Sequence, residues 1–243
     1  MNPEEYDKLL RIEKAHWFYA GKRQLARWAI ETFGGKQGKS VELLDCGAGT
    51  GCFADEVRDD YRVRVLDDHA ESLELLRKKF AAEDIIEGSA TSIPVGDGSL
   101  DVVTLMDVLE HVEDDQGALG EIHRVLRPEG VLVLTVPALR QLWSKWDECL
   151  HHFRRYQRED LIQLFDPEKW EICHLKYVNI FVYPFVWWVR RSPFSDHSGS
   201  SENFVPPAWI NGFLRWVFVS SAKARWLPAP LGVGLFLVAR RRA

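Results

Sequence analysis

The stretch Val41–Phe53, VELLDCGAGTGCF, decides the fold of this chain. Its first residues, including Leu43 and Leu44, indicate a buried strand, and glycines then follow at every second position from Gly47 to Gly51. A helical pattern comes next, and the order strand, glycine turn, helix begins a βαβ unit. Glycines permit the sharp turn and leave bare backbone for a ligand, toward which the following helix points free N–H groups. The stretch therefore predicts an α/β fold with a ligand site at this turn.

The spacing of the glycines distinguishes two classes of ligand. A dinucleotide site has the pattern G-x-G-x-x-G, which from Gly47 requires a third glycine where this chain has Cys52. The pattern present is D-x-G-x-G-x-G, and it begins with Asp45. It resembles motif I of the class I S-adenosylmethionine-dependent methyltransferases, in which the acid lies near the cationic methionine part of the cofactor. A glycine-rich turn without a ligand is the alternative.

The resemblance implies a fold, a cofactor and a reaction. The expected fold is α/β, with a Rossmann-like, doubly wound, mostly parallel seven-stranded sheet that carries helices on both faces. The expected reaction transfers a methyl group from S-adenosyl-L-methionine to a small-molecule or lipid-like acceptor. The cofactor-binding residues expected on this basis are Asp45, Gly47, Ala48, Gly49, Gly51, Asp67, Asp68, Ser89, Ala90 and Met106. Two alternatives are an NAD(P)-dependent oxidoreductase and a non-catalytic module that binds a cofactor or docks on a membrane.

The ribose candidate follows the second predicted strand, Arg62–Leu66. Asp67 comes directly after it, and an ionised carboxylate has acceptors for both ribose hydroxyls. Asp68 should point away, because side chains alternate along an extended chain. Capping of the predicted helix Glu71–Phe80 is the other interpretation of an acid at this position.

The third predicted strand, 84–87, leads to the adenine candidates. In the family this turn often carries an acid that meets the adenine amino group, whereas here Ser89 stands in that place. A backbone N–H of Ala90 could still bind the ring. The next residues, 93–103, IPVGDGSLDVV, resemble a further family stretch and lead into a fourth strand, Leu100–Leu105.

The acceptor candidates come from two stretches and, in the case of Trp17, from the N-terminal segment. In the family an E-H-V sequence after the fourth strand lines the pocket near the transferred methyl, and here it places Glu110 and His111. An H-x-x-R-Y stretch within residues 143–161 resembles part of the acceptor pocket. The catalytic candidates are His111 and Tyr156, and the substrate candidates are Glu110, His111, His151, Arg155, Tyr156 and Trp17. His111 can accept a proton near neutral pH, but a structural histidine bonded to backbone is the favoured interpretation.

A metal site is not expected from the sequence. The pattern Cys149-x-His151-His152 offers possible ligands, but no second ligand pair has a suitable spacing. We therefore predict that this loop recognises a polar or anionic acceptor through arginine and tyrosine side chains.

The segments before and after the core carry aromatic residues. Residues Glu4–Phe33 are predicted to form a helix within an N-terminal cap, 1–39, whose E-x-x-H-W-F stretch resembles one that lies over the cofactor in some family members. Simple packing of these aromatics on the core is an equal alternative. The core is expected at 40–175 and 230–243, so that one methyltransferase domain spans 1–243.

The remaining segment, 176–229, is predicted to be a helical insertion. Five of the ten tryptophans follow residue 180, and Trp209–Trp226 has helical spacing with basic residues at its edges. Three interpretations stay open for 181–226: a membrane-surface or lipid-facing lid, a simple extension of the core, and a homodimer contact.

Composition limits the partners and the compartment. The net charge is −5, so nucleic acid is not an expected partner. Four scattered cysteines indicate reduced thiols, and the acidic N-terminus is unlike a signal peptide. No apolar run reaches the roughly 18 residues that a membrane span needs. These features predict a cytoplasmic protein, with contact to the inner face of the membrane as an extension of that prediction.

Overall fold

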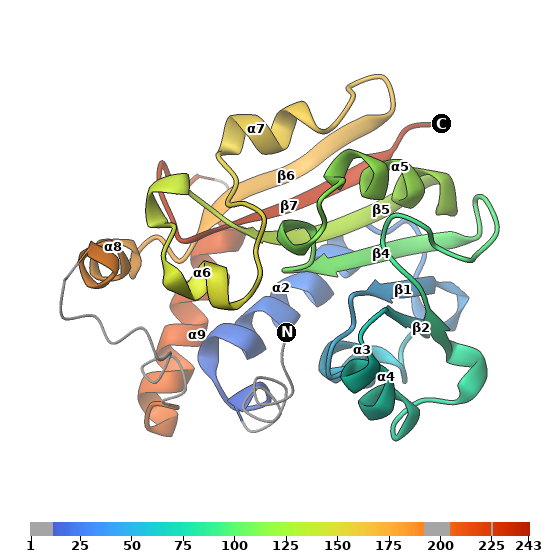
Figure 1. The fold of residues 1–243 in the computed structure, drawn as a ribbon, viewed down its shortest axis with the longest axis horizontal. Helices are drawn as coiled ribbons and strands as arrows, with labels where there is room; N and C mark the ends of the chain where they lie inside the picture. Colours follow the sequence, from blue (N-terminus) through green and yellow to red (C-terminus); the bar gives the residue numbers. More distant parts are fainter. Residues whose placement is uncertain (1–11, 192–204, 225) are drawn as a thin grey trace.

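The computed structural model describes residues 12–191, 205–224 and 226–243, and these contain one seven-stranded sheet (Figure 1). The strand order is β3-β2-β1-β4-β5-β7-β6, and β7 runs antiparallel to both of its neighbours. The strands are β1 Glu42–Cys46, β2 Arg62–Asp67, β3 Ile85–Glu87, β4 Leu100–Met106, β5 Leu126–Pro137, β6 Trp170–Val178 and β7 Gly234–Arg241. The predicted Rossmann-like fold class is confirmed.

Helices cover both faces of the sheet. One layer of the core joins α2 (Trp17–Phe33), α3 (Cys52–Val57), α4 (Ala70–Arg77) and α9 (Ala208–Lys223) to the sheet. The other layer holds α5 (Asp115–Val125) and α7 (Arg158–Gln163). The short helix α6 (Lys145–Cys149) and α8 (Tyr183–Arg191) lie toward one end of the sheet (Figure 1). Strands β4 and β5 are buried between these layers, and most residues of 102–106 (VVTLM) and 131–136 (VLVLTV) are accordingly apolar.

The strand and helix boundaries differ from the sequence prediction by a few residues. Helix α5 ends at Val125, because Leu126 pairs with Leu100 and already belongs to β5. Strand β5 then continues to Pro137, which pairs with the first residue of β7. Periodicity in the sequence does not show this pairing between distant segments.

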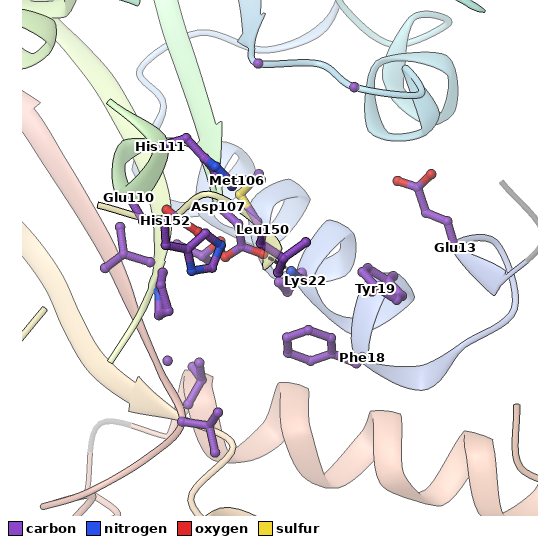
Figure 2. Close-up of a pocket in the computed structure, with 18 of the residues that line it drawn as sticks. Glu13, Phe18, Tyr19, Lys22, Met106, Asp107, Glu110, His111, Leu150 and His152 are labelled. Atoms are coloured by element: carbon purple, nitrogen blue, oxygen red, sulfur yellow. Dashed lines mark hydrogen bonds and ion pairs between the residues drawn. The ribbon is translucent and has the colours of Figure 1, made fainter. Parts of the chain in front are cut away.

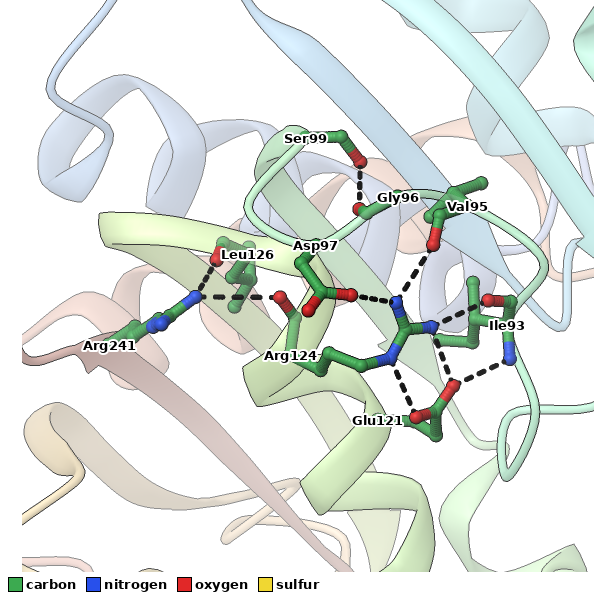
Figure 3. A network of polar contacts seen from close by, with 9 residues as sticks. All are labelled: Ile93, Val95, Gly96, Asp97, Ser99, Glu121, Arg124, Leu126 and Arg241. Atoms are coloured by element: carbon green, nitrogen blue, oxygen red, sulfur yellow. Dashed lines mark hydrogen bonds and ion pairs between the residues drawn. The ribbon is translucent and has the colours of Figure 1, made fainter.

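The stretch that follows β3 is held by one arginine (Figure 3). The Arg124 guanidinium on α5 donates to the carbonyl oxygens of Ile93 and Val95 and to the carboxylate of Asp97, at 2.6–2.9 Å. It also pairs with Glu121 at 2.8 Å. The family-like stretch at residues 93–103 therefore has a structural explanation, since its carbonyl groups and acid fix the loop that enters β4.

The N-terminal helix prediction was wrong in extent. Residues 4–11 of the predicted helix lie outside the described residues, and α2 begins only at Trp17. His16 caps this helix, because its Nδ1 accepts from the backbone N–H of Phe18 at 3.3 Å. The cap ends the helical pattern on its N-terminal side and lets the preceding residues turn toward the glycine stretch.

The insertion between β6 and β7 contributes α8 and α9, of which α9 packs on α2. A Cβ added to Gly21 would lie 2.6 Å from the Phe218 ring, so the two helices approach closely at this glycine. Asn211 bonds the N–H of Trp17 at 2.7 Å. One side of α9 is thus an extension of the core, while its other side leaves Trp209 and Trp216 exposed.

Among the described residues, no helix is both long and apolar enough to cross a membrane.

Candidate active site

The glycine turn after β1 has an open side. Gly47 and Gly49 have φ of 72° and 56°, which L side chains rarely adopt. A Cβ on Gly47 would lie 2.4 Å from Val108, and one on Gly51 would meet Leu76 and Phe80, whereas one on Gly49 would meet nothing within 4 Å. Gly47 and Gly51 therefore serve internal packing, and Gly49 leaves backbone uncovered.

Two carboxylates lie beside this turn. Asp67, the last residue of β2, accepts from the N–H of Gly49 at 2.8 Å and from the N–H of His69 at 3.0 Å. Asp45, at the end of β1, accepts from the Thr104 hydroxyl at 2.7 Å. Burial raises the pKa of Asp45 to about 7. A cation beside Asp45 would favour its ionised form.

A cavity of about 340 Å³ joins the glycine turn to the carboxyl ends of β4 and β5. Open parallel sheets bind their ligands at this edge. Residues 12–23 form a further wall, where Phe18, Tyr19 and Lys22 face the cavity (Figure 2). Glu13 lines it too and bonds the Thr50 hydroxyl within the glycine turn. The N-terminal segment thus lies over the turn.

The wall beyond β4 is polar. Asp107 follows β4 with φ of 57°, pairs with Lys22 and accepts from the Thr135 hydroxyl at 2.8 Å. Burial opposes ionisation of Asp107, but Lys22 and Thr135 lower its pKa below the usual range. Next to it, burial raises the pKa of Glu110 well above its usual range and lowers that of His111 to about 4. The His111 imidazole is therefore neutral near pH 7.

A buried carboxylate organises the wall formed by residues 143–156. Asp147 is 0% exposed and accepts from Arg155 at 2.7 Å and from Arg190 at 2.9 Å. Its Oδ1 also lies 3.1 Å from Nδ1 of His152. Arg190 comes from α8, so Asp147 ties the insertion to the cavity.

Comparisons with known proteins agree with this geometry. A family model described as a methyltransferase domain matches residues 44–134. The chain is 33% identical over 128 residues to a malonyl-[acyl-carrier protein] O-methyltransferase of Enterobacter lignolyticus, covering 50% of this chain and 51% of that protein. It is 31% identical over 134 residues to a probable S-adenosylmethionine-dependent methyltransferase of Mycolicibacterium smegmatis, covering 54% and 52%.

The chain thus carries, at residues 44–134, a methyltransferase domain that is similar to those of the class I S-adenosylmethionine-dependent enzymes.

It spans about half the length of the curated relatives that it matches. Solved structures show the same fold over more of the chain. A possible histamine N-methyltransferase of Thermotoga maritima aligns with a TM-score of 0.64 at 17% identity, covering 99% of this chain and 95% of that one. A [4+2]-cyclase, SpnF, aligns with a TM-score of 0.57 at 20% identity, covering 91% and 81%. Since the fold also carries a cyclase, the fold alone does not fix the reaction.

The predicted cofactor residues fall into two groups. Those that line the cavity are Asp45, Gly47, Ala48, Gly49 and Met106. Those that do not line it are Gly51, Asp67, Asp68, Ser89 and Ala90. Asp67 still touches the turn through Gly49, whereas Asp68 is exposed and bonded to the His69 ring at 2.7 Å. The prediction that Asp68 and Gly51 contact the ligand was therefore wrong, whereas Asp67 stays a candidate.

Three predicted acceptor residues do not reach the cavity. Tyr156 is buried, and its hydroxyl bonds Asp115 at 3.0 Å and the Leu109 carbonyl at 3.3 Å. His151 is exposed and has φ of 57°, and this turn leaves its neighbour His152 to line the cavity. Trp17 packs edge-on against Phe218 instead. These corrections remove Tyr156 as a catalytic candidate, while Glu110, His111 and Arg155 do line the cavity.

Several cavity residues were missed by sequence reasoning. They are Glu13, Phe18, Tyr19, Lys22, Asp107, His152 and Arg190. The E-x-x-H-W-F stretch was a signal for the first three, because it implied a segment over the cofactor. The sequence carries no comparable signal for Arg190, which reaches the cavity from an insertion.

Asp45 is expected to make the binding of a cationic ligand depend on pH. Its folded pKa of about 7 lies above the usual value near 3.9, so the folded state holds this proton more tightly than the unfolded chain. The contribution of Asp45 to stability therefore falls as pH rises from about 4 to 7. Because a cationic ligand binds the ionised form, we expect S-adenosylmethionine to bind roughly 10- to 30-fold more weakly at pH 5.5 than at pH 7.5.

Calorimetric titration at the two pH values measures this difference. In Asp45→Asn the affinity should be lower and nearly independent of pH. If the affinity of this variant changed with pH as much as that of the unmodified protein, a titrating group other than Asp45 would be responsible.

Proposed function

We propose that this chain transfers a methyl group from S-adenosylmethionine to a small-molecule or lipid-like acceptor. The observation that carries the proposal is the single cavity that joins the bare backbone at Gly49 to the polar groups beyond β4. The bound cofactor would supply the electrophilic methyl group. Asp45 would face the cationic methionine part, and Asp67 would hold the turn and offer its carboxylate to the ribose. Ser89–Ala90 lie outside the lining of this cavity and would meet the adenine only where it extends past that lining.

The chain's own residues would promote the reaction mainly by placing the acceptor and excluding water. Phe18, Val136 and Leu235 give the cavity apolar walls, which suit an acceptor with an apolar body. Arg155 and Arg190 share Asp147, which leaves an excess of positive charge on one wall. That excess suits an acceptor with a polar or anionic end.

Two measurements test the proposal. Purified protein, a cell extract and a methyl donor with an isotopically labelled methyl group are expected to give a labelled product by mass spectrometry. Calorimetric titration is expected to show binding of S-adenosylhomocysteine and none of NADH. Binding of NADH alone would favour the oxidoreductase alternative. Binding of S-adenosylhomocysteine without any labelled product would favour a non-catalytic module.

A second proposal concerns the exposed side of the insertion, which we infer to contact a membrane surface. Trp209 is 77% exposed and Trp216 64% exposed, and Phe213 lies beside them on α9. Arg215 on the same helix is exposed as well. Tryptophans with basic neighbours on a helix surface suit the headgroup region of a bilayer. The other helix of the insertion, α8, supplies Arg190 to the cavity, so the insertion also contributes to the acceptor wall, which suits a lipid-like acceptor.

Liposome flotation tests the membrane proposal. The intact protein is expected to float with vesicles that contain anionic lipid, and a Trp209→Ser, Trp216→Ser double variant should float several-fold less. Trp143→Ser removes a partly exposed tryptophan from another surface and should float normally. The proposal fails if the intact protein stays at the bottom of the gradient, and self-association in sedimentation would favour the homodimer interpretation instead.

A further inference from the structure

We propose that Glu110, His111 and His152 form a binding site for one divalent metal ion of the zinc, cobalt or manganese type. Each residue offers one ligand atom, and the three atoms lie within 4.8 Å of one another. Figure 2 shows the three side chains together beyond the end of β4, on the cavity wall. Two imidazoles and one carboxylate are a donor set that binds these ions and leaves positions open for a substrate.

The separations fit such an ion after small rotations. A zinc ion lies about 2.0–2.2 Å from nitrogen and oxygen ligands, so neighbouring ligand atoms in a tetrahedral site are about 3.3 Å apart. The ring centroids of His111 and His152 are already 4.6 Å apart, with the rings nearly perpendicular at 85°. Both rings would have to rotate about their side-chain bonds to direct a nitrogen at one ion.

Glu110 provides a second and independent observation. This residue is 1% exposed and lines the cavity. Within the described part of the chain, its Oε2 atom is buried and has no hydrogen-bond partner. A buried carboxylate oxygen without a donor is costly and needs an explanation. A metal ion between Glu110 and the two histidines would satisfy this oxygen.

The support behind His152 also points to a metal ligand. Its Nδ1 lies 3.1 Å from Oδ1 of Asp147, which leaves Nε2 for the cavity. Histidines that bind metals usually donate their other N–H to a carboxylate, which fixes the ring and its tautomer. Asp147 is itself fixed by Arg155 and Arg190, so the orientation of His152 is set before any ion binds.

The neighbouring positive charges do not compete for Glu110. Lys22 is paired with Asp107, and Arg155 and Arg190 are both paired with Asp147. Among the described residues at this end of the cavity, Glu110 thus has no cation paired with its carboxylate. An ion bound here could take an acceptor oxygen as a further ligand and lower the pKa of its hydroxyl. In this role the ion would act on an acceptor that attacks through oxygen, and the role therefore rests on the proposed function. Binding of the ion itself does not rest on the proposed function.

Calorimetric titration of the chelator-treated full-length protein with zinc chloride, and separately with manganese chloride, tests the site without cofactor or substrate. We expect one ion per chain. His152→Ala, His111→Ala and Glu110→Gln should each weaken binding at least tenfold. His151→Ala and Cys149→Ser remove exposed neighbours that could bind zinc adventitiously, and neither should change the affinity.

Circular dichroism of each variant verifies that it is folded. Absence of saturable one-to-one binding of either ion would overturn the proposal. So would a loss of affinity in His151→Ala as large as that in His152→Ala. Titration with S-adenosylhomocysteine in the same preparations tests the proposed function separately, because the metal ligands are not needed for the turn at Gly49 to bind it.

Discussion

Replacement of Asp147 by alanine is expected to lower the free energy of unfolding by about 3–5 kcal/mol. Asp147 is fully buried and accepts from Arg155 and Arg190, which come from a loop and from α8. Without the carboxylate, two largely buried guanidinium groups face each other with no counter-charge. Removal of one partner from a buried ion pair is costly for this reason, even when the intact pair adds little net stability.

Chemical denaturation followed by circular dichroism measures this loss. Glu31→Ala is the matched control, because Glu31 forms an exposed pair with Arg27 on α2 at 3.0 Å. Such exposed i,i+4 pairs contribute only about 0.3–0.5 kcal/mol. If Asp147→Ala were as stable as this control, the two arginines would not depend on Asp147, and its role as the organiser of this wall would be wrong.

Replacement of Gly49 by alanine is expected to weaken S-adenosylhomocysteine binding at least tenfold while the protein stays folded. The new methyl group meets no atom of the protein within 4 Å, so it enters the space where the ligand is proposed to lie. The stability cost should come from the positive φ alone, about 1–2 kcal/mol for a residue other than glycine.

Gly98→Ala separates the effect on binding from the effect on the backbone. Gly98 has φ of 54°, close to the 56° of Gly49, and a Cβ there also has open space. It lies in the turn before β4 and does not line the cavity. The two variants should unfold at similar denaturant concentrations, but only Gly49→Ala should lose affinity. Equal affinities would mean that the ligand does not lie against Gly49.

The sequence predicted the core of the fold well because the relevant signals are local. The apolar run into Asp45, the glycines of the turn and the β-branched run of β5 report on neighbouring residues and on burial. Strand identity and the ligand edge of the sheet follow from these signals. The exact ends of β5 and α2 do not follow, because they depend on pairing with β7 and on the cap at His16.

The sequence was less informative about the acceptor side of the cavity. His151 and His152 are adjacent and chemically alike, and the loop has no periodicity that would show which of them faces inward. The backbone turn at His151 decides the matter and leaves His152 beside Asp147. Tyr156 is a second case in which only the tertiary structure shows where the side chain lies. Its motif suggested the acceptor pocket, but its hydroxyl bonds Asp115.

By itself the sequence determined the sheet, the glycine turn and the family, because spacing along the chain is enough to encode a strand, a bend and a helix. Only the tertiary structure decided which charged groups meet. It brings together Lys22 and Asp107, and it places Glu110 beside His152 and Asp147 beside Arg190, although each pair is separated by some 40 or more residues. Contacts of this kind depend on how distant segments fold over one edge of the sheet, and that arrangement is not recorded in any local pattern.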